Sequence, residues 1–152
     1  MQVFEIAPAG TRTLLFLLPL ILIPIVIVTV VLGASLMGMK SARFEVSNAG
    51  LRLKGDLYGR TIPAADLIAG AARRVSVDPS SEYQPRRRTV GTGIPGYRAG
   101  WFRLRNGEKA LLYLTDPTKA VYIPTRAGYS VLLSPSDPDG FINAIRAVAP
   151  AS

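Results

Sequence analysis

Three groups of residues have types and spacings that could carry chemistry. Residues 91–96, GTGIPG, have the G-x-G-x-x-G spacing of a loop that binds the pyrophosphate of a dinucleotide. Asp137 and Asp139 form a pair of carboxylates, and the run Arg86–Arg88 presents three guanidinium groups that can bind carboxylates or phosphates. The chain contains no His and no Cys, which excludes Ser-His-Asp catalysis, a cysteine nucleophile and a zinc site on Cys or His ligands.

The context of the three glycines argues against a nucleotide site. A dinucleotide fingerprint requires a strand before the glycines, a helix that opens within them and an acidic residue about 20 positions further on. Pro95-Gly96 breaks any helix at this point, and Asp116, which has the right separation, has no βαβ unit around it. We therefore expect no cofactor, and we expect the glycines to shape a loop that lets Tyr97 and Trp101 pack close to the backbone.

The carboxylates have a structural explanation. Asp137 and Asp139 come just before an apolar pattern of helical spacing, where they can cap the helix and complement its dipole. The other aspartates considered, Asp66, Asp78 and Asp116, are separate in the sequence and lack the spacing of a metal-binding loop. We expect neither a metal nor a catalytic residue.

The basic residues are the most informative group. The formal net charge is +8, and the excess lies after residue 39, where seventeen Lys and Arg accompany nine Asp and Glu. Two interpretations stay open: a solvated loop that aids solubility, or a surface that contacts anionic lipid, a phosphate or an acidic partner segment. Nucleic acid is disfavoured, because Tyr83 and Tyr97 flank the densest run only loosely and form no stacking platform. The candidate contact residues are Arg73, Arg74, Arg86, Arg87 and Arg88.

An apolar segment precedes all of these groups. Residues 13–39 contain no charged residue, and their length suits one crossing of a hydrocarbon core about 30 Å thick. Pro19 and Pro24 should kink such a helix rather than break it. The alternative is a cleaved signal peptide, but the apolar region of a signal peptide is typically about 7–15 residues long. Lys and Arg are more frequent after the segment than before it, which predicts a cytoplasmic C-terminal domain and a short tail, residues 1–12, on the other side of the cell membrane.

Residues 40–152 are predicted to form one mainly β domain. Short stretches of alternating apolar residues, about seven or eight in all, are separated by turn signals. The clearest of these signals are Asn48–Gly50, Asn106-Gly107 and residues 126–128.

Two further segments complete the predicted domain. The polar residues 78–97 are predicted to form a long loop after a strand at residues 71–77. Residues 136–148 have the apolar spacing of an amphipathic helix. Antiparallel strands must close or cover their edges, and a barrel with one open end that is plugged by this helix would do so.

Three phrases carry a resemblance to a known family. They are FEVSNAGLRL at residues 44–53, GTGIPGYRAGWFRLRNG at residues 91–107, and VYIPTRAGYSVLLSPSDPDGFINAI at residues 121–145. With the preceding apolar helix, they resemble the bacterial PH-like domains of small membrane-anchored proteins. The resemblance implies a PH-like antiparallel barrel of about seven strands with a C-terminal α-helix, preceded by one transmembrane helix, and it transfers no catalytic or binding residue.

These observations predict a single-pass membrane protein whose PH-like domain is a non-catalytic binding or scaffold module. Its expected partner is another membrane protein, with contact between the arginine-rich face and acidic lipid as a further expectation. The alternative is a membrane-tethered enzyme or enzyme subunit that uses carboxylate, Lys or Tyr groups, which would need a deep pocket holding a carboxyl group of raised pKa. A third hypothesis is a structural element that oligomerises through an exposed strand edge.

Overall fold

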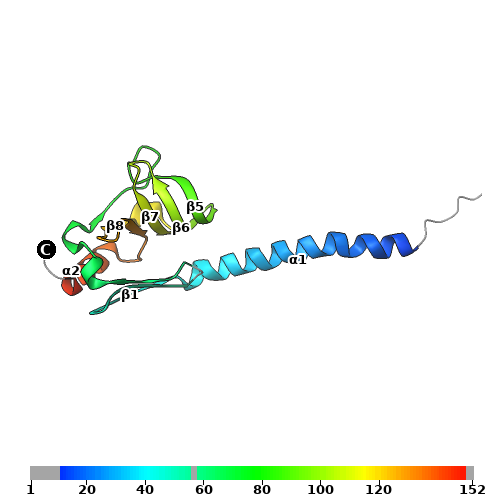
Figure 1. Ribbon diagram of the computed structural model, residues 1–152, viewed down its shortest axis with the longest axis horizontal. Helices are drawn as coiled ribbons and strands as arrows, with labels where there is room; N and C mark the ends of the chain where they lie inside the picture. Colours follow the sequence, from blue (N-terminus) through cyan, green and yellow to red (C-terminus); the bar gives the residue numbers. More distant parts are fainter. Residues whose placement is uncertain (1–10, 56–57, 150–152) are drawn as a thin grey trace, which may run out of the picture. The chain divides into compact units, whose positions relative to one another are not determined.

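The computed structural model describes residues 11–55 and 58–149, so most of the expected tail at residues 1–12 lies outside the described residues. The chain divides into two compact units, one ending at Met37 and one beginning at Gly38. Figure 1 shows the elements in sequence colours. They are, in chain order, α1 (Thr11–Ser41), β1 (Arg43–Ser47), β2 (Gly50–Lys54), β3 (Thr61–Pro63), the short 3-10 helices η1 (Ala64–Asp66) and η2 (Ala69–Ala71), β4 (Arg73–Arg74), β5 (Pro85–Ile94), β6 (Tyr97–Leu104), β7 (Lys109–Leu114), η3 (Pro117–Lys119), β8 (Val121–Pro124), β9 (Ser130–Leu133) and α2 (Pro138–Val148).

The first unit consists of most of α1, which continues through Pro19 and Pro24 without a break. Its segment Leu17–Ala34 has a mean hydropathy of 2.8, and every side chain in it is exposed. The hydroxyl of Thr29 donates to the carbonyl oxygen of Ile25 at 2.8 Å, so this polar group is satisfied within the helix. Among the described helices, α1 is the one whose length and composition suit a membrane span, as the sequence predicts.

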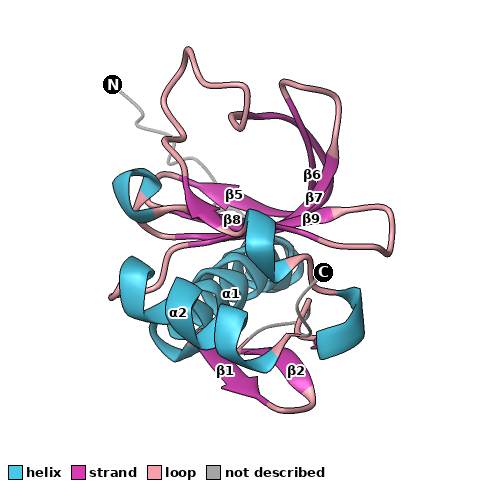
Figure 2. Cartoon of the chain, turned by 90° about the vertical axis from the view of Figure 1, so that its left-hand side faces the viewer, coloured by secondary structure: helices cyan, strands magenta, loops and turns pink. Residues whose placement is uncertain are grey.

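The second unit contains two sheets, which Figure 2 shows as separate groups of strands. The first sheet has the order β1-β2-β3, and the second has the order β4-β8-β9-β7-β6-β5. All pairings are antiparallel except that of β7 with β9, which is parallel. No hydrogen-bonded strand pair joins the two described sheets, so they do not close into a barrel. The predicted mainly β architecture with a C-terminal helix is confirmed.

The predicted turns are confirmed. Asn48 and Ala49 form the turn between β1 and β2, and residues 126–128 form the turn between β8 and β9. Asn106-Gly107 joins β6 to β7, and Gly107 has a φ of 90°, a conformation that glycine adopts without steric cost.

The long loop predicted for residues 78–97 is wrong in its second half, because β5 is a strand of ten residues there. β5 pairs with β6, and Gly91 lies opposite Gly100. A Cβ on Gly91 would lie 2.4 Å from the carbonyl oxygen of Ala99, so the missing side chain allows the two backbones to approach. β5 and β6 form a hairpin that turns at Pro95-Gly96, a pairing that the polar, glycine-rich composition of residues 85–94 does not indicate.

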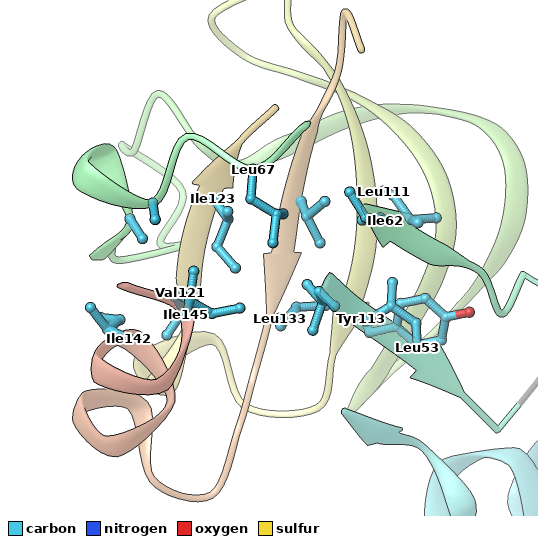
Figure 3. Close-up of a cluster of buried hydrophobic side chains, with 14 of the residues drawn as sticks. Leu53, Ile62, Leu67, Leu111, Tyr113, Val121, Ile123, Leu133, Ile142 and Ile145 are labelled. Carbon is cyan, nitrogen blue, oxygen red and sulfur yellow. The ribbon is translucent and has the colours of Figure 1, made fainter. Parts of the chain in front are cut away.

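Buried apolar side chains cover both faces of the six-stranded sheet, because alternate residues of a strand point to opposite faces. The larger cluster lies between this sheet, the three-stranded sheet and α2, as the labelled side chains of Figure 3 show. The smaller cluster is on the other face and is covered by the chain that follows β4. For this reason the strand predicted at residues 71–77 is reduced to β4: Val77 has left the sheet and packs on its face.

The C-terminal helix α2 forms where the sequence predicts it. A carboxylate oxygen of Asp137 accepts a hydrogen bond from the backbone N–H of Gly140 at 3.0 Å, and Pro138 occupies the first turn. Ile142 and Ile145 are buried in the larger cluster. Capping therefore accounts for Asp137 without a catalytic role.

Candidate functional site

An open groove of about 840 Å³ lies between β5, β6 and the chain that follows β4. Its lining includes three arginines and no Asp or Glu. We call it the arginine groove; it is lined by Arg86, Arg88 and Arg98 and by apolar side chains that include Val77, Ile94, Phe102 and Leu114.

Two of the three arginines of β5 line the groove, although the pairing of β5 with β6 shifts register between Pro85 and Arg87 and between Arg88 and Val90. Arg86 and Arg88 line it together with Phe102, which lies opposite Arg88 on β6. A Cβ built on Gly93 would lie 3.9 Å from Nη1 of Arg88 and 3.9 Å from Cζ of Phe102. The guanidinium of Arg88 and the ring of Phe102 therefore flank a backbone position without a side chain, which leaves room beside the cation.

The wall opposite β5 belongs to residues 75–84 and is held by local hydrogen bonds. Asp78 accepts hydrogen bonds from the hydroxyls of Ser80 and Ser76 at 2.6 and 2.8 Å, and these bonds lower the pKa of Asp78 to about 2. Nη1 of Arg105 donates to the carbonyl oxygen of Pro79 at 2.9 Å and ties this wall to the end of β6. The carboxylate of Asp78 is engaged within the wall and does not line the groove.

Within the part of the chain that the structure describes, no ion pair involves the arginines of the groove. The ion pairs within residues 11–55 and 58–149 join Lys54 to Glu45 at 2.7 Å and Arg74 to Asp139 at 3.3 Å. Residues 85–114 carry seven Lys and Arg but one acidic residue, Glu108. Uncompensated guanidinium groups beside an apolar floor can bind an anion by charge-assisted, bidentate hydrogen bonds.

The structure places Arg73 and Arg74 far from the other candidates in the sheet order, because β4 and β5 are the two outermost strands of the six. The guanidinium of Arg73 lies 4.8 Å from the ring centroid of Tyr122, and Arg73 donates to the hydroxyl of Tyr83. Arg74 forms the ion pair with Asp139 on α2. Both arginines of β4 therefore have partners within the domain.

Arg87 lies on the opposite face of the sheet from the groove. It is directly opposite Arg103 on β6, which is in turn directly opposite Lys109 on β7. Like charges that are opposite each other on neighbouring strands are destabilising. Nζ of Lys109 lies 4.5 Å from the ring centroid of Trp101, which partly offsets this repulsion. We call these three residues the cationic row.

Sequence reasoning missed both Arg98 as a member of the groove and the cationic row. Arg98 is ten residues from Arg88 in the sequence, and only the pairing of β5 with β6 brings it to the same groove. The turn signal at Asn106-Gly107 could have indicated that Arg98 and Arg103 lie on a strand, but residues 85–94, which form the partner strand β5, are predicted as part of a loop.

The other titratable groups do not resemble an acid–base site. Glu45, Asp78 and Asp116, the carboxyl groups whose pKa clearly departs from the ordinary value, are all shifted downward, for Asp116 chiefly by hydrogen bonds from Thr118. Burial, followed by a hydrogen bond to Glu108, raises the pKa of Tyr122 to about 12. Among the described residues no three metal-ligating side chains gather.

The three glycines of the G-x-G-x-x-G spacing at residues 91–96 have separate structural roles. Gly91 and Gly93 belong to β5, and Gly96 lies in the turn to β6 with a φ of 81°. The chain continues from Gly96 into a strand, so no helix N-terminus is present to hold a pyrophosphate. Tyr97 is buried and Trp101 is half-buried.

Comparison with known proteins gives one finding. The family model described as "Bacterial PH domain" matches residues 42–149, which include both sheets and α2. No curated protein and no solved structure matches the chain.

Proposed function

Because the chain belongs to the bacterial PH domain family, we propose that it is a membrane-anchored, non-catalytic binding module. Its arginine groove would bind an acidic segment of another membrane protein. The single observation that carries this proposal is the convergence of Arg86, Arg88 and Arg98 on a groove that no carboxylate lines.

The groove supplies two kinds of interaction. Guanidinium groups form bidentate hydrogen bonds with carboxylates, and these are stronger than bonds between neutral groups. Phe102, Ile94 and Leu114 add apolar surface next to the cations, which favours a peptide segment over a free ion because it also buries aliphatic side-chain atoms.

The anchor part of the proposal rests on α1 and on the connection that follows it. α1 ends at Ser41 and β1 begins at Arg43, so a single residue connects them. If α1 spans the cell membrane, this connection holds the domain within a few residues' reach of the bilayer. The positive residues that follow α1 favour a cytoplasmic domain, where acidic lipid could add about 1 kcal/mol for each Lys or Arg near the surface.

The test is cross-linking in native membranes with the double variant Arg86→Glu/Arg88→Glu. Its charge-matched control is Arg52→Glu/Arg126→Glu, which alters two exposed arginines that do not line the groove. We expect the groove variant to lose at least about 90% of its cross-linked partner, as a loss of roughly 1.4 kcal/mol or more would produce, and the control variant to keep it. Equal yields from the two variants would refute the groove as the binding site.

The same two variants distinguish an acidic protein partner from anionic lipid as the ligand of the groove. Binding of the full chain in uncharged detergent to acidic peptides tests the protein partner, and reconstitution into anionic or neutral vesicles tests lipid contact. If the groove variant changes only the lipid-dependent signal, the partner is lipid and not an acidic protein segment.

A further inference from the structure

β5 is a long strand with one free side. Among the described strands it is the last in the order of the six-stranded sheet and pairs only with β6, and Figure 1 shows it outermost beyond β6 and β7. An edge strand presents unpaired N–H and C=O groups to which another extended chain can pair. Ten residues make this edge longer than that of the other outermost strand, the two-residue β4.

The side chains along this edge are open to solvent. All residues from Arg86 to Val90 are exposed. Val90 is 56% exposed, and it is the large exposed hydrophobic residue of the described chain outside α1. An incoming strand would therefore find both unpaired backbone and one apolar contact.

The cationic row ends at this free edge. Lys109, Arg103 and Arg87 occupy directly opposite positions on three adjacent strands, so the next position in the row lies outside β5. Nη1 of Arg103 donates to the carbonyl oxygen of Gly107 at 2.8 Å, and Lys109 contacts the ring of Trp101, but neither partner carries a negative charge. A carboxylate next to Arg87 would turn a destabilising row into one with an opposite-charge pair.

A second copy of this chain is a poor occupant of the edge. If two β5 strands paired in parallel and in register, three consecutive arginines of one copy would lie beside three of the other. A full-length antiparallel pairing would place Arg86–Arg88 opposite residues 91–93, which carry no negative charge. Pro85 also lacks the N–H that a continued pairing would use. In neither direction does β5 supply a carboxylate to the arginines of the other copy, whereas an acidic strand does.

We propose that an extended segment with three consecutive acidic residues adds to the free edge of β5 as a further strand. Its first and third acidic side chains face Arg86 and Arg88 in the arginine groove, and the middle one faces Arg87 and continues the cationic row. Backbone hydrogen bonds supply affinity that does not depend on sequence, and the three charges select the segment. This inference rests on the proposed function, because it specifies how the acidic partner of the groove is held.

The experiment uses the full chain in uncharged detergent at low ionic strength. The probe is a capped peptide of about eight residues, with three consecutive glutamates flanked by Val and Thr, which favour extended structure. Two further peptides carry N-methyl groups on alternate backbone amides, one on each of the two alternating sets. Only one set can donate to β5 in a given pairing. A fourth peptide replaces the glutamates with glutamines.

We expect one N-methylated peptide to bind at least roughly tenfold more weakly than the parent, since it loses two or three backbone hydrogen bonds, and the other to bind within about threefold of it. The glutamine peptide should bind at least roughly tenfold more weakly, because the charge-assisted bonds are lost. Hydrogen exchange of the β5 amides should slow when the parent peptide is bound.

Equal affinity of both N-methylated peptides, or an equal loss in both, would overturn strand addition. If the parent peptide then still depends on its glutamates and on Arg86 and Arg88, the acidic-segment function stands without strand addition. If no peptide binds and the variant Arg86→Glu/Arg88→Glu keeps its partner in membranes, the proposed function fails as well.

Discussion

At the β4 edge of the six-stranded sheet, Arg73 lies over the rings of Tyr83 and Tyr122, whereas at the β5 edge Arg86 and Arg88 open into a groove. Both edges carry arginines in succession. At β4, tyrosine rings, a backbone carbonyl and the carboxylate of Asp139 engage the two side chains. At β5, no described carboxylate forms an ion pair with the arginines.

The difference shows that arginines clustered in a sequence do not all form a surface that can bind an anion, because some of them are engaged by partners within the domain. Arg73 acts as a packing residue, because its planar guanidinium covers two rings of the smaller apolar cluster. Arg88 lies on an edge strand opposite Phe102, and the other charged side chains that line its groove are Arg86 and Arg98. The β5 edge, rather than the whole set of arginines, is therefore the surface that remains available for an anion.

The largest effect is expected from a substitution that disrupts the pairing of β5 with β6. The variant Gly100→Ala would place a Cβ 2.5 Å from the carbonyl oxygen of Val90, at a residue whose φ is 114°. We expect it to lower the free energy of unfolding by about 3 kcal/mol or more, because backbone must move and the conformation is strained. Denaturation of the full chain in detergent, followed by the fluorescence of Trp101, measures this.

The matched control for that variant is Gly96→Ala, in the turn between β5 and β6. Its φ is 81°, but no atom lies within 4 Å of the added Cβ. We expect a loss of about 1 kcal/mol from conformational strain alone. If the two variants lose the same stability, close approach of β5 to β6 is not what the glycine at position 100 provides.

The second prediction compares an alanine substitution at the β4 edge with one at the β5 edge. Arg73→Ala should lower the free energy of unfolding by about 1–2 kcal/mol, because it removes two cation–π contacts and the hydrogen bond to Tyr83. Arg88→Ala should change it by less than about 0.5 kcal/mol, as expected for a surface residue. Binding of the acidic peptide should respond in the opposite way, weakening only for Arg88→Ala. Weaker peptide binding by Arg73→Ala would contradict the claim that only the arginines of the β5 edge bind the acidic segment.

The third prediction tests the network beside Arg73 by pH. Burial raises the pKa of Tyr122 to about 12 from the value of 10.0 expected in the unfolded chain. The folded state therefore favours the neutral phenol, and the associated stability is complete below pH 10 and is lost as the pH rises through 12. Unfolding free energies measured from pH 9 upward should fall more steeply for the natural chain than for Tyr122→Phe. Parallel curves would mean that the phenol is not protected in the fold.

The smallest effects should have opposite signs at the two edges. Arg74→Gln removes an exposed ion pair with Asp139 and should lower the free energy of unfolding by a few tenths of a kcal/mol. Arg87→Gln removes a like-charge contact with Arg103 and should raise it by a similar amount. High salt should reduce both differences, because exposed charges are screened. A stability loss in Arg87→Gln would show that this arginine already has a partner.

The sequence by itself determined the elements whose causes are local. A continuous apolar run predicts α1 whatever surrounds it, and Asn106-Gly107 predicts the β6–β7 turn because the required backbone conformation belongs to those two residues. Asp137 and the apolar spacing after it predict α2 in the same way. The family resemblance carried by residues 44–53, 91–107 and 121–145 is confirmed by the match over residues 42–149.

Only the tertiary structure decided the site. β5 pairs with β6 across the turn at Pro95-Gly96, and Gly91 and Gly100 let the two backbones approach, although the residues of β5 by themselves resemble a loop. Pairing across strands brings Arg98 to Arg88, aligns Arg87 with Arg103 and Lys109, and places Arg73 at the other end of the sheet. Charge is a property of each residue, but compensation of charge depends on neighbours that are distant in the sequence. For that reason the sequence could count the arginines, and only the fold could separate those that are already paired from those that remain open.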